Sequence, residues 1–200
     1  VAFGVAALAG VWLIVIAGWV IALIGVASIA ATLGYVGGPI PYGYRGLGEV
    51  FVFVFFGLVA TVGSRYVHDR TAPLDAWALA IPVGALIAAI LVANNLRDLE
   101  TDARAGKRTL AVMLGRPATI ALYRSLVWGS FLAVPLYAAL DVVPVGSLLA
   151  LIAAPLAVGP TRIVSTATDG PSLIEALAGT ARLQLVFGVL VAVGVNLPVG

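Results

Sequence analysis

The sequence predicts an all-α protein, a polytopic bundle of transmembrane helices, and three observations support this fold class. Hydrophobic residues make up 62% of the 200 residues and charged residues only 10%, whereas a soluble domain carries roughly 25% charged residues. The apolar residues fall into runs of near-spanning length, and a membrane-spanning helix needs about 20 residues. These runs lack the polar–apolar alternation of barrel strands, so helices are the expected way to cross the lipid.

Seven apolar runs are expected to form the spans. Only Gly18-Trp19 separates the first two, so one long helix followed by a re-entrant piece is the alternative for that region. The later runs are separated by segments with turn-forming or charged residues. In chain order the runs are Val1–Ile16, Trp19–Tyr35, Glu49–Val67, Ala76–Ala93, Ala118–Leu140, Val143–Ile163 and Ala181–Pro198.

The connections between these runs differ in composition. The first is rich in glycine and proline, the third is long and charged, and the last is predicted to be a long loop because it contains Pro160, Gly170 and Pro171. The connections are Val36–Gly48, Arg65–Asp75, Asn94–Arg116, Asp141–Pro144 and Gly159–Ala178.

The basic residues predict the orientation, because cytoplasmic loops carry an excess of lysine and arginine. Alternating loops place eight basic residues on one side and two, Arg65 and Arg70, on the other. The predicted location is therefore the plasma (inner) membrane, with the larger group on the cytoplasmic face. That group consists of Arg45, Arg97, Arg104, Lys107, Arg108, Arg116, Arg162 and Arg182.

The bulk charge and the absence of cysteine exclude several classes of function. The net charge is +2, and no basic face exists apart from one cluster, so nucleic acid is not an expected partner. The chain has no cysteine, which excludes disulfides, thiol catalysis and zinc–thiolate sites. The mean hydropathy of +1.13 instead makes the lipid bilayer the expected environment.

The segment Asn94–Arg108 concentrates the polar chemistry, with three of the nine acidic and four of the eleven basic residues. In a helix, Asn94, Asp98 and Asp102 would lie along one stripe at intervals of four residues. Carboxylates in this arrangement suit Mg²⁺, which shares its remaining ligand positions with water and substrate phosphate. Lys107 and Arg108 follow, and both residue types bind phosphate. The alternative interpretation is a solvated helix at the membrane edge with internal ion pairs.

Two patches of sequence resemble the UbiA superfamily of intramembrane prenyltransferases. The stretch from Asn94-Asn95-x-Arg97-Asp98 to Gly106-Lys107-Arg108-Thr109-Leu110 is similar to the second aspartate-rich motif of that family. The stretch from Gly37-Gly38-Pro39-Ile40-Pro41-Tyr42-Gly43-Tyr44-Arg45 to Phe53 resembles the loop between its fourth and fifth helices. Both are closest to the 1,4-dihydroxy-2-naphthoate polyprenyltransferases of menaquinone biosynthesis, and they occur in the same order.

The resemblance implies a magnesium-dependent transfer of a polyprenyl group from polyprenyl diphosphate to 1,4-dihydroxy-2-naphthoate, with decarboxylation to demethylmenaquinol. Asp98 and Asp102 would bind Mg²⁺, and Lys107 would pair with the diphosphate. Glu49 is expected to orient Arg45 or to cap the following helix. The other residues expected to contact substrate are Tyr42, Tyr44, Arg45, Asn94, Arg97 and Arg108, with Arg104 a weaker candidate.

The sequence departs from the family pattern in one respect. Family members have nine spans and a first motif of the type Asn-Asp-x-x-Asp after the second span. The seven runs match spans three to nine, and no such motif precedes Asn94. The chain is therefore expected to be a single membrane domain, residues 1–200, that lacks the first two helices and half of the metal site. Such a chain is expected to be inactive alone.

Other functions are weighed against this interpretation. A related enzyme could prenylate 4-hydroxybenzoate, homogentisate or a porphyrin, although the two patches favour the naphthoate acceptor. A transporter would place charges within its spans, whereas here they gather at one end of the spans. A non-catalytic membrane protein is the third alternative, because the first motif is missing.

Overall fold

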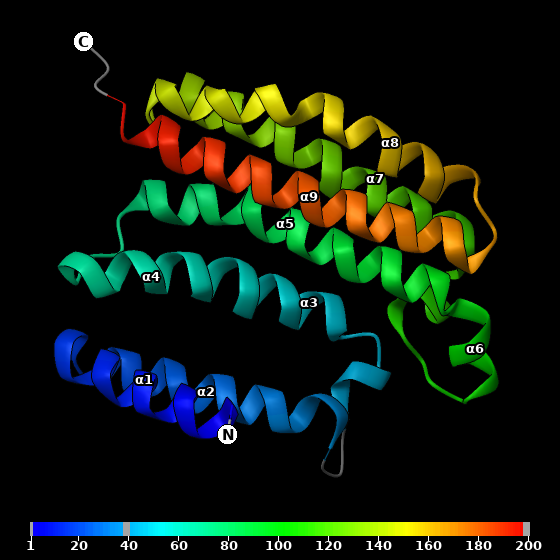
Figure 1. The fold of residues 1–200 in the computed structure, drawn as a ribbon, viewed down its shortest axis with the longest axis horizontal. Helices are drawn as coiled ribbons and strands as arrows, with labels where there is room; N and C mark the ends of the chain where they lie inside the picture. Colours follow the sequence, from blue (N-terminus) through cyan, green and yellow to red (C-terminus); the bar gives the residue numbers. More distant parts are fainter. Residues whose placement is uncertain (1, 38–40, 198–200) are drawn as a thin grey trace.

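The computed structural model describes residues 2–37 and 41–197, and every regular element in these two ranges is helical (Figure 1). The predicted all-α fold is confirmed. The elements are α1 (Ala2–Ala17), α2 (Trp19–Val36), the 3-10 turn η1 (Tyr42–Tyr44), α3 (Gly48–Val52), the π-helix η2 (Phe53–Val59), α4 (Ala60–Asp69), α5 (Leu74–Arg97), α6 (Leu99–Arg104), α7 (Leu110–Ala139), the 3-10 helix η3 (Val145–Ala153), α8 (Ala154–Thr166) and α9 (Gly170–Val195).

All seven predicted runs are present as helical segments. Five continuous helical stretches are long and apolar enough to cross a membrane, and two shorter apolar helices, Gly4–Ala17 and Trp19–Tyr35, precede them. Val1, Gly38–Ile40 and Pro198, which fall within predicted segments, lie outside the described residues. The five longer stretches are Gly48–Asp69, Leu74–Arg97, Leu110–Ala139, Val145–Thr166 and Gly170–Val195.

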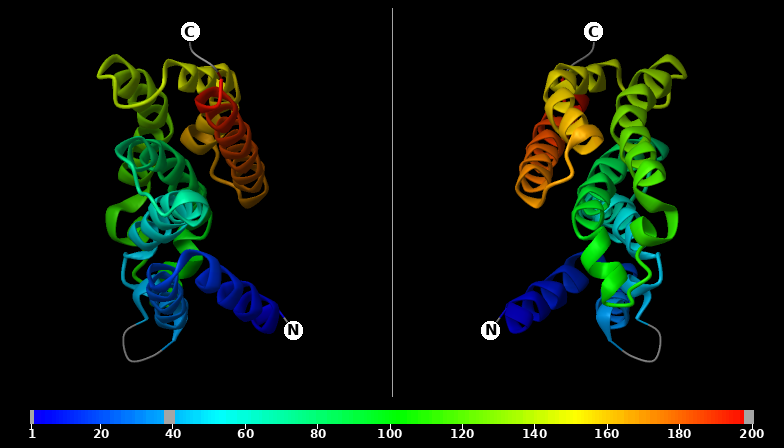
Figure 2. Two further views of the ribbon diagram at one scale, coloured as in Figure 1. Left: turned by 90° about the vertical axis from the view of Figure 1, so that its left-hand side faces the viewer. Right: turned by 90° about the vertical axis from the view of Figure 1, so that its right-hand side faces the viewer.

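A turn at Gly18 separates α1 from α2, so the two-helix prediction is confirmed over the single long helix. Gly18 has a φ of 87°, a conformation that glycine adopts without the steric cost of a Cβ atom. Figure 2 shows α1 leaning away from the other helices, and most of its described side chains are exposed. The guanidinium of Arg70 at the end of α4 donates to the carbonyl oxygen of Ile16 at 2.6 Å.

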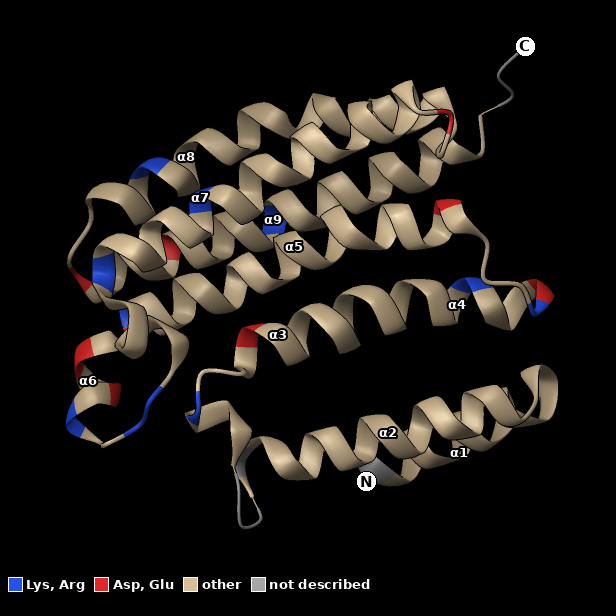
Figure 3. Ribbon diagram, turned by 180° about the vertical axis from the view of Figure 1, so that it is seen from behind, with Lys and Arg blue, Asp and Glu red and all other residues tan. Residues whose placement is uncertain are grey.

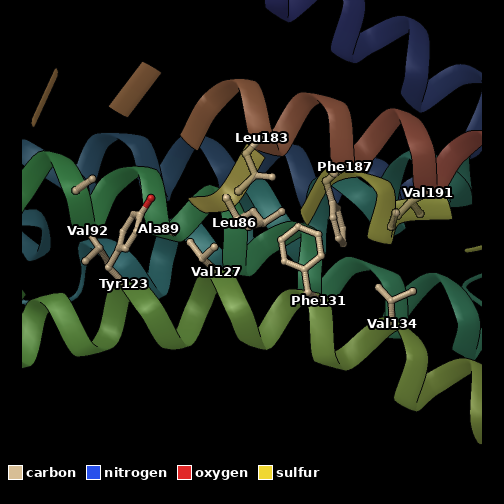
Figure 4. Packing of buried hydrophobic residues seen from close by; sticks show 14 of the residues in the cluster. Leu86, Ala89, Val92, Tyr123, Val127, Phe131, Val134, Leu183, Phe187 and Val191 are labelled. Atoms are coloured by element: carbon tan, nitrogen blue, oxygen red, sulfur yellow. The ribbon is translucent and has the colours of Figure 1, made fainter. Parts of the chain in front are cut away.

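The hydrophobic core forms where α5 packs between α7 and α9. Leu86 from α5, Val127 from α7 and Leu183 from α9 are fully buried together (Figure 4). Small residues allow close helix contacts elsewhere. A Cβ atom on Gly57 would overlap the Cα atom of Gly84, so η2 and α5 approach closely only because both positions are glycine.

The long loop predicted over Gly159–Ala178 is wrong, because α8 continues to Thr166 and α9 begins at Gly170. The prolines there fit helices. Pro160 lies inside α8, and its ring occupies the space that a side chain at Gly179 would fill. Pro171 occupies the first turn of α9, where no amide donor is needed. The side chain of Asp169 caps that turn by accepting from the amide of Ser172 at 2.9 Å.

Two further boundaries differ from the prediction. The last span begins at Gly170 rather than Ala181, so Arg182 lies about halfway along α9 and not beside a cytoplasmic loop. Span α7 begins at Leu110 rather than Ala118, with a kink at Gly115 (φ 74°). The guanidinium of Arg116, next to this kink, donates to the carbonyl oxygen of Ala167 and joins α7 to the short α8–α9 connection.

The connections alternate between the two ends of the bundle, as the predicted topology requires. The η1 turn, the α6 segment and the α8–α9 connection lie at one end, which we call the α6 end (Figures 1 and 3). The α4–α5 connection and the turn after α7 lie at the opposite end. The predicted gathering of the Tyr-Arg loop and the charged segment at one end is therefore confirmed.

Candidate functional site

Two aspartates lie one helical turn apart where α5 ends. Asp98 separates α5 from α6, and its backbone (φ −91°, ψ 5°) interrupts the helix. The amide of Asp102 still donates to the carbonyl oxygen of Asp98 at 2.8 Å. The amide of Asp98 donates to the carbonyl oxygen of Asn94 at 3.1 Å. The predicted stripe of Asn94, Asp98 and Asp102 is therefore bent at Asp98 rather than straight.

Each aspartate is paired with its own cation. Arg97 holds Asp98 with two bonds, from Nε to Oδ1 at 2.8 Å and from Nη2 to Oδ2 at 2.6 Å. Lys107 Nζ donates to Oδ1 of Asp102 at 2.8 Å. The hydrogen bonds from Arg97 lower the pKa of Asp98, and the hydrogen bond to Asp102 raises the pKa of Lys107. Asp98 and Lys107 are therefore both charged near neutral pH.

The loop that carries η1 contacts the segment after α6. The amide of Arg108 donates to the carbonyl oxygen of Tyr44 at 3.0 Å, and Lys107 Nζ lies 5.3 Å from the centroid of the Tyr44 ring. Gly46 has a φ of 73°, and the space for a side chain at this position is occupied by the Sδ atom of Met113. Segments far apart in the sequence therefore form one surface at the α6 end.

An apolar cavity of about 640 Å³ lies between α2 and the α3–η2–α4 span, next to this loop. Aromatic rings form one wall. The rings of Tyr42 and Phe51 stack with centroids 3.8 Å apart, and Phe55 continues the stack at 5.9 Å from Phe51. The hydroxyl of Tyr42 donates to the carbonyl oxygen of Ala31 in α2. The π-helix η2 carries Phe55, and π-turns of this kind are frequent at functional sites.

A second pocket of about 420 Å³ shares Val52 and Phe56 with this cavity. Asn94 from α5 and Leu177 from α9 line its other walls. The predicted site residue Asn94 therefore faces a mainly apolar space, immediately before the two aspartates in the chain. The apolar spaces and the acidic segment adjoin each other.

The remaining predicted site residues are accessible at the α6 end. Arg45, Arg104 and Arg108 are exposed, and Tyr44 is 37% exposed. In residues 2–37 and 41–197, no side-chain hydrogen bond or ion pair of these arginines is found. Their guanidinium groups can therefore reach an anion that approaches from the aqueous side.

A buried pair that the sequence did not predict joins α3 to α5. Asn95 Nδ2 donates to Oε1 of Glu49 at 2.7 Å, and both side chains are buried. Of the two expected roles of Glu49, orienting Arg45 is wrong, because its side chain bonds Asn95. Glu49 does lie in the first turn of α3, where a negative charge is favourable, but makes no side-chain cap. The sequence indicated only that Glu49 is an acidic residue in an apolar stretch. Its partner Asn95 could not be predicted, because it lies 46 positions away in the chain.

The donor set fits half of a magnesium site. Within the described parts of the chain, no group of three histidine, cysteine or acidic side chains is placed to hold a metal ion. Asp98 and Asp102 supply two carboxylates one turn apart, and Mg²⁺ commonly takes only one or two protein carboxylates beside substrate phosphates. Their partners Arg97 and Lys107 would have to release them for such a cation to bind.

Comparison with known proteins gives one family and several relatives. The model of the UbiA prenyltransferase family matches residues 1–175. A 1,4-dihydroxy-2-naphthoate octaprenyltransferase from Mycobacterium tuberculosis is 43% identical over 187 residues, covering 93% of this chain and 63% of the relative. The proteins of the same name from Mycobacterium leprae and Escherichia coli are 42% and 34% identical, each over 175 residues. They cover 87% and 88% of this chain, and 58% and 57% of those relatives.

The chain thus spans about three-fifths of the length of these relatives. No solved structure matches it.

Proposed function

The chain belongs to the UbiA prenyltransferase family, and from this premise we propose that the protein transfers a polyprenyl group from polyprenyl diphosphate to 1,4-dihydroxy-2-naphthoate. The carboxylate of the acceptor leaves as CO2, and the product is demethylmenaquinol in menaquinone biosynthesis. The relatives named for this reaction support the choice of acceptor. Because the chain spans about three-fifths of their length, the activity is proposed for the protein that contains it.

One observation carries the proposal: two aspartates with paired cations follow Asn94, which lines a pocket that shares Val52 and Phe56 with the aromatic-lined cavity. Asp98 and Asp102 would hold Mg²⁺, which would offset the negative charge that develops on the leaving diphosphate. Lys107 and Arg97 already neutralise the same two carboxylates. With the carboxylates holding the cation, these basic groups would be free to bind diphosphate oxygens.

The apolar cavity suits the hydrocarbon part of the donor. Its wall contains the rings of Tyr42, Phe51 and Phe55, which stack on one another and offer apolar contact to an isoprenoid chain. The allylic carbon gains positive charge as its bond to the diphosphate oxygen breaks and the electron pair leaves with the diphosphate. A ring carbon of the acceptor then forms the new carbon–carbon bond. Apolar walls also exclude water, which would otherwise capture the allylic cation.

The exposed basic residues suit the acidic acceptor. Arg45 and Arg108 lie on the aqueous side of the Tyr44 loop, where an aromatic carboxylate arrives. Tyr44 adds an exposed ring beside Lys107. We propose that these residues bind and orient the acceptor, with Asn94 contacting substrate from the adjoining pocket.

Family membership and the spanning-length helices make the chain a multi-pass membrane protein. We further propose that it lies in the plasma membrane with the α6 end towards the cytoplasm. The excess of basic residues at that end supports this orientation. In this orientation, the diphosphate group of the donor and the aromatic acid would both reach the site from the cytoplasm.

A product assay tests the proposed reaction. The complete gene product in nanodiscs is supplied with Mg²⁺, a polyprenyl diphosphate and separate aromatic acids: 1,4-dihydroxy-2-naphthoate, 4-hydroxybenzoate and homogentisate. Mass spectrometry is expected to find a prenylated, decarboxylated product only with the naphthoate, and none after chelation of the metal. Prenylation of 4-hydroxybenzoate or homogentisate instead would contradict the proposed acceptor.

A further inference from the structure

The buried pair of Glu49 and Asn95 occupies a special position between the two halves of the candidate site. Glu49 lies in the first turn of α3, four residues after Arg45. Asn95 lies in the last turn of α5, three residues before Asp98. Their 2.7 Å hydrogen bond therefore ties the end of the Tyr-Arg loop to the start of the acidic segment.

Among the described residues, this bond is one of two hydrogen bonds between these segments. The other is the backbone bond from the amide of Arg108 to Tyr44, on the aqueous side of the site. Glu49 and Asn95 are 6% and 9% exposed, so their bond lies on the protein side and is shielded from water. Water competes little for a buried hydrogen bond, and its partners therefore hold each other's position more firmly than an exposed pair does.

The bond uses one oxygen of Glu49 and leaves the other without a partner. Oε2 is buried and makes no hydrogen bond within residues 2–37 and 41–197. Burying a carboxylate with an unmatched oxygen is unfavourable, and such groups in folded proteins call for a specific explanation. The hydrogen bond to Asn95 needs only an acceptor of the right length, which glutamine also supplies.

We propose that Glu49 is a positioning residue that, through Asn95, fixes the acidic segment relative to the Tyr44–Arg45 loop. This inference rests on the proposed function. It adds a buried residue that sets the distance between the two parts of the site without contacting substrate. The distance between the metal-binding acids and the acceptor-binding loop decides whether donor and acceptor meet. A displacement of about 1 Å in such a geometry costs about 100-fold in rate.

Kinetics of four variants of the complete gene product in nanodiscs test the proposal. Glu49→Leu and Asn95→Leu each remove the bond and are expected to lower kcat about 100-fold. The double variant is expected to be no slower than either single variant, because both remove the same interaction. Glu49→Gln keeps the acceptor oxygen and is expected to retain most of the wild-type kcat.

Thr180→Val is the matched control. Thr180 is fully buried and bonds the hydroxyl of Tyr123 at 2.7 Å, so the variant also removes a buried inter-helix bond, but between α7 and α9. Its kcat is expected to stay near that of the wild type. An equal loss in Thr180→Val, or near-normal kcat in Glu49→Leu, would overturn the positioning role. Inactivity of Glu49→Gln would also overturn it, because the carboxylate would then act by its charge or its proton.

A distance measurement separates this inference from the proposed reaction. The 200 residues contain no cysteine. With any cysteine elsewhere in the complete gene product replaced by serine, spin labels can be placed at exposed Leu47→Cys and Arg104→Cys without a competing thiol. Pulsed electron resonance should give a narrow distance distribution in the wild-type background and in Glu49→Gln, and a broad one in Glu49→Leu. If the protein prenylates no aromatic acid, this result still decides the role of Glu49. An unchanged distribution in Glu49→Leu refutes it.

Discussion

The two ends of the bundle both carry local ion pairs, but they differ in the chain segments that meet beside those pairs. At the opposite end, Asp69 bonds Arg65 one turn away and Thr71 two residues away, and Asp75 accepts from the next amide. At the α6 end, Asp98 and Asp102 also pair with nearby residues, but there the backbone of Arg108 bonds that of Tyr44, which is distant in the sequence. Local pairing gives a solvated turn, whereas convergence of distant segments gives a site.

Burial follows the same division. The side chain of Asp102 is 11% exposed in its pair with Lys107, whereas that of Asp69 is 39% exposed in its pair with Arg65. A partly buried ion pair is screened less by salt than an exposed one. The long-range bond from Arg70 to Ile16 at the opposite end only caps the last turn of α1. The comparison therefore supports the proposal that the reaction takes place at the α6 end.

The largest expected effect comes from removing the acids of the α6 end. Asp98→Ala and Asp102→Ala should each lower magnesium-dependent prenyl transfer by about 10²–10³-fold, because each removes a group that stabilises developing charge. Steady-state kinetics of the complete gene product measure this. Exposed Glu100→Ala in the same segment and Asp69→Ala at the opposite end are controls. Near-normal turnover in either aspartate variant would disprove the metal assignment.

Lys107 is expected to rank next. Lys107→Met removes a charged hydrogen-bonding group that we assign to the diphosphate, so kcat/KM for the donor should fall about 10–100-fold. Arg65→Met removes a cation of similar exposure at the opposite end and should leave this parameter unchanged. Equal losses in the two variants would show that net charge, and not the site, is being measured.

The apolar cavity beside the proposed site should limit the length of the polyprenyl chain that the donor can carry. Ala60→Trp inserts a large ring into the cavity next to Phe56 and should lower kcat/KM for a long polyprenyl diphosphate about tenfold, with a smaller effect on a short one. Ala192→Trp places the same ring in a pocket of about 330 Å³ that contains Arg65 and Asp75. If only Ala192→Trp lowered kcat/KM for the long donor, the binding site of the polyprenyl chain would lie at the opposite end instead.

A smaller effect is expected at Arg45. The residue is exposed, and single exposed charge contacts contribute little, so Arg45→Ala should raise KM for the aromatic acid about three- to fivefold. Arg65→Ala should raise it less. Equal, small changes in both variants would mean that the Tyr44–Arg45 loop is structural only.

The pH dependence should give the smallest change. Because Arg97 lowers the pKa of Asp98, the stabilising pair is fully formed above the ordinary aspartate pKa of about 3.9 and is lost only as the pH falls through the lower folded-state value. Arg97→Leu should therefore shift the acid limb of the pH–rate profile to higher pH. Arg65→Leu should leave the limb in place, and a shift there as large as that in Arg97→Leu would contradict the assignment.

The helical bundle, the seven apolar segments and the gathering of charge in Asn94–Arg108 were predictable from the order of the residues alone. These properties depend on short-range features. Apolar runs that cross lipid must be helical, and turns form where glycine or charged residues interrupt the runs. Predictions from local composition failed where the structure depends on how helices pack against each other. Pro160 marked a loop by composition, but it lies inside α8 against Gly179, where a neighbouring helix accommodates its ring.

Which distant residues meet could not be predicted before the helices were packed together. The pairing of Glu49 with Asn95, the contact of Arg108 with Tyr44 and the wall of Phe51 and Phe55 beside Tyr42 have no signature in local spacing. Side chains far apart in the chain come together because helices pack on their neighbours, and that packing follows from shape and small residues rather than from periodicity. The sequence therefore pointed to the acids of the proposed site, and the fold showed which residues surround them.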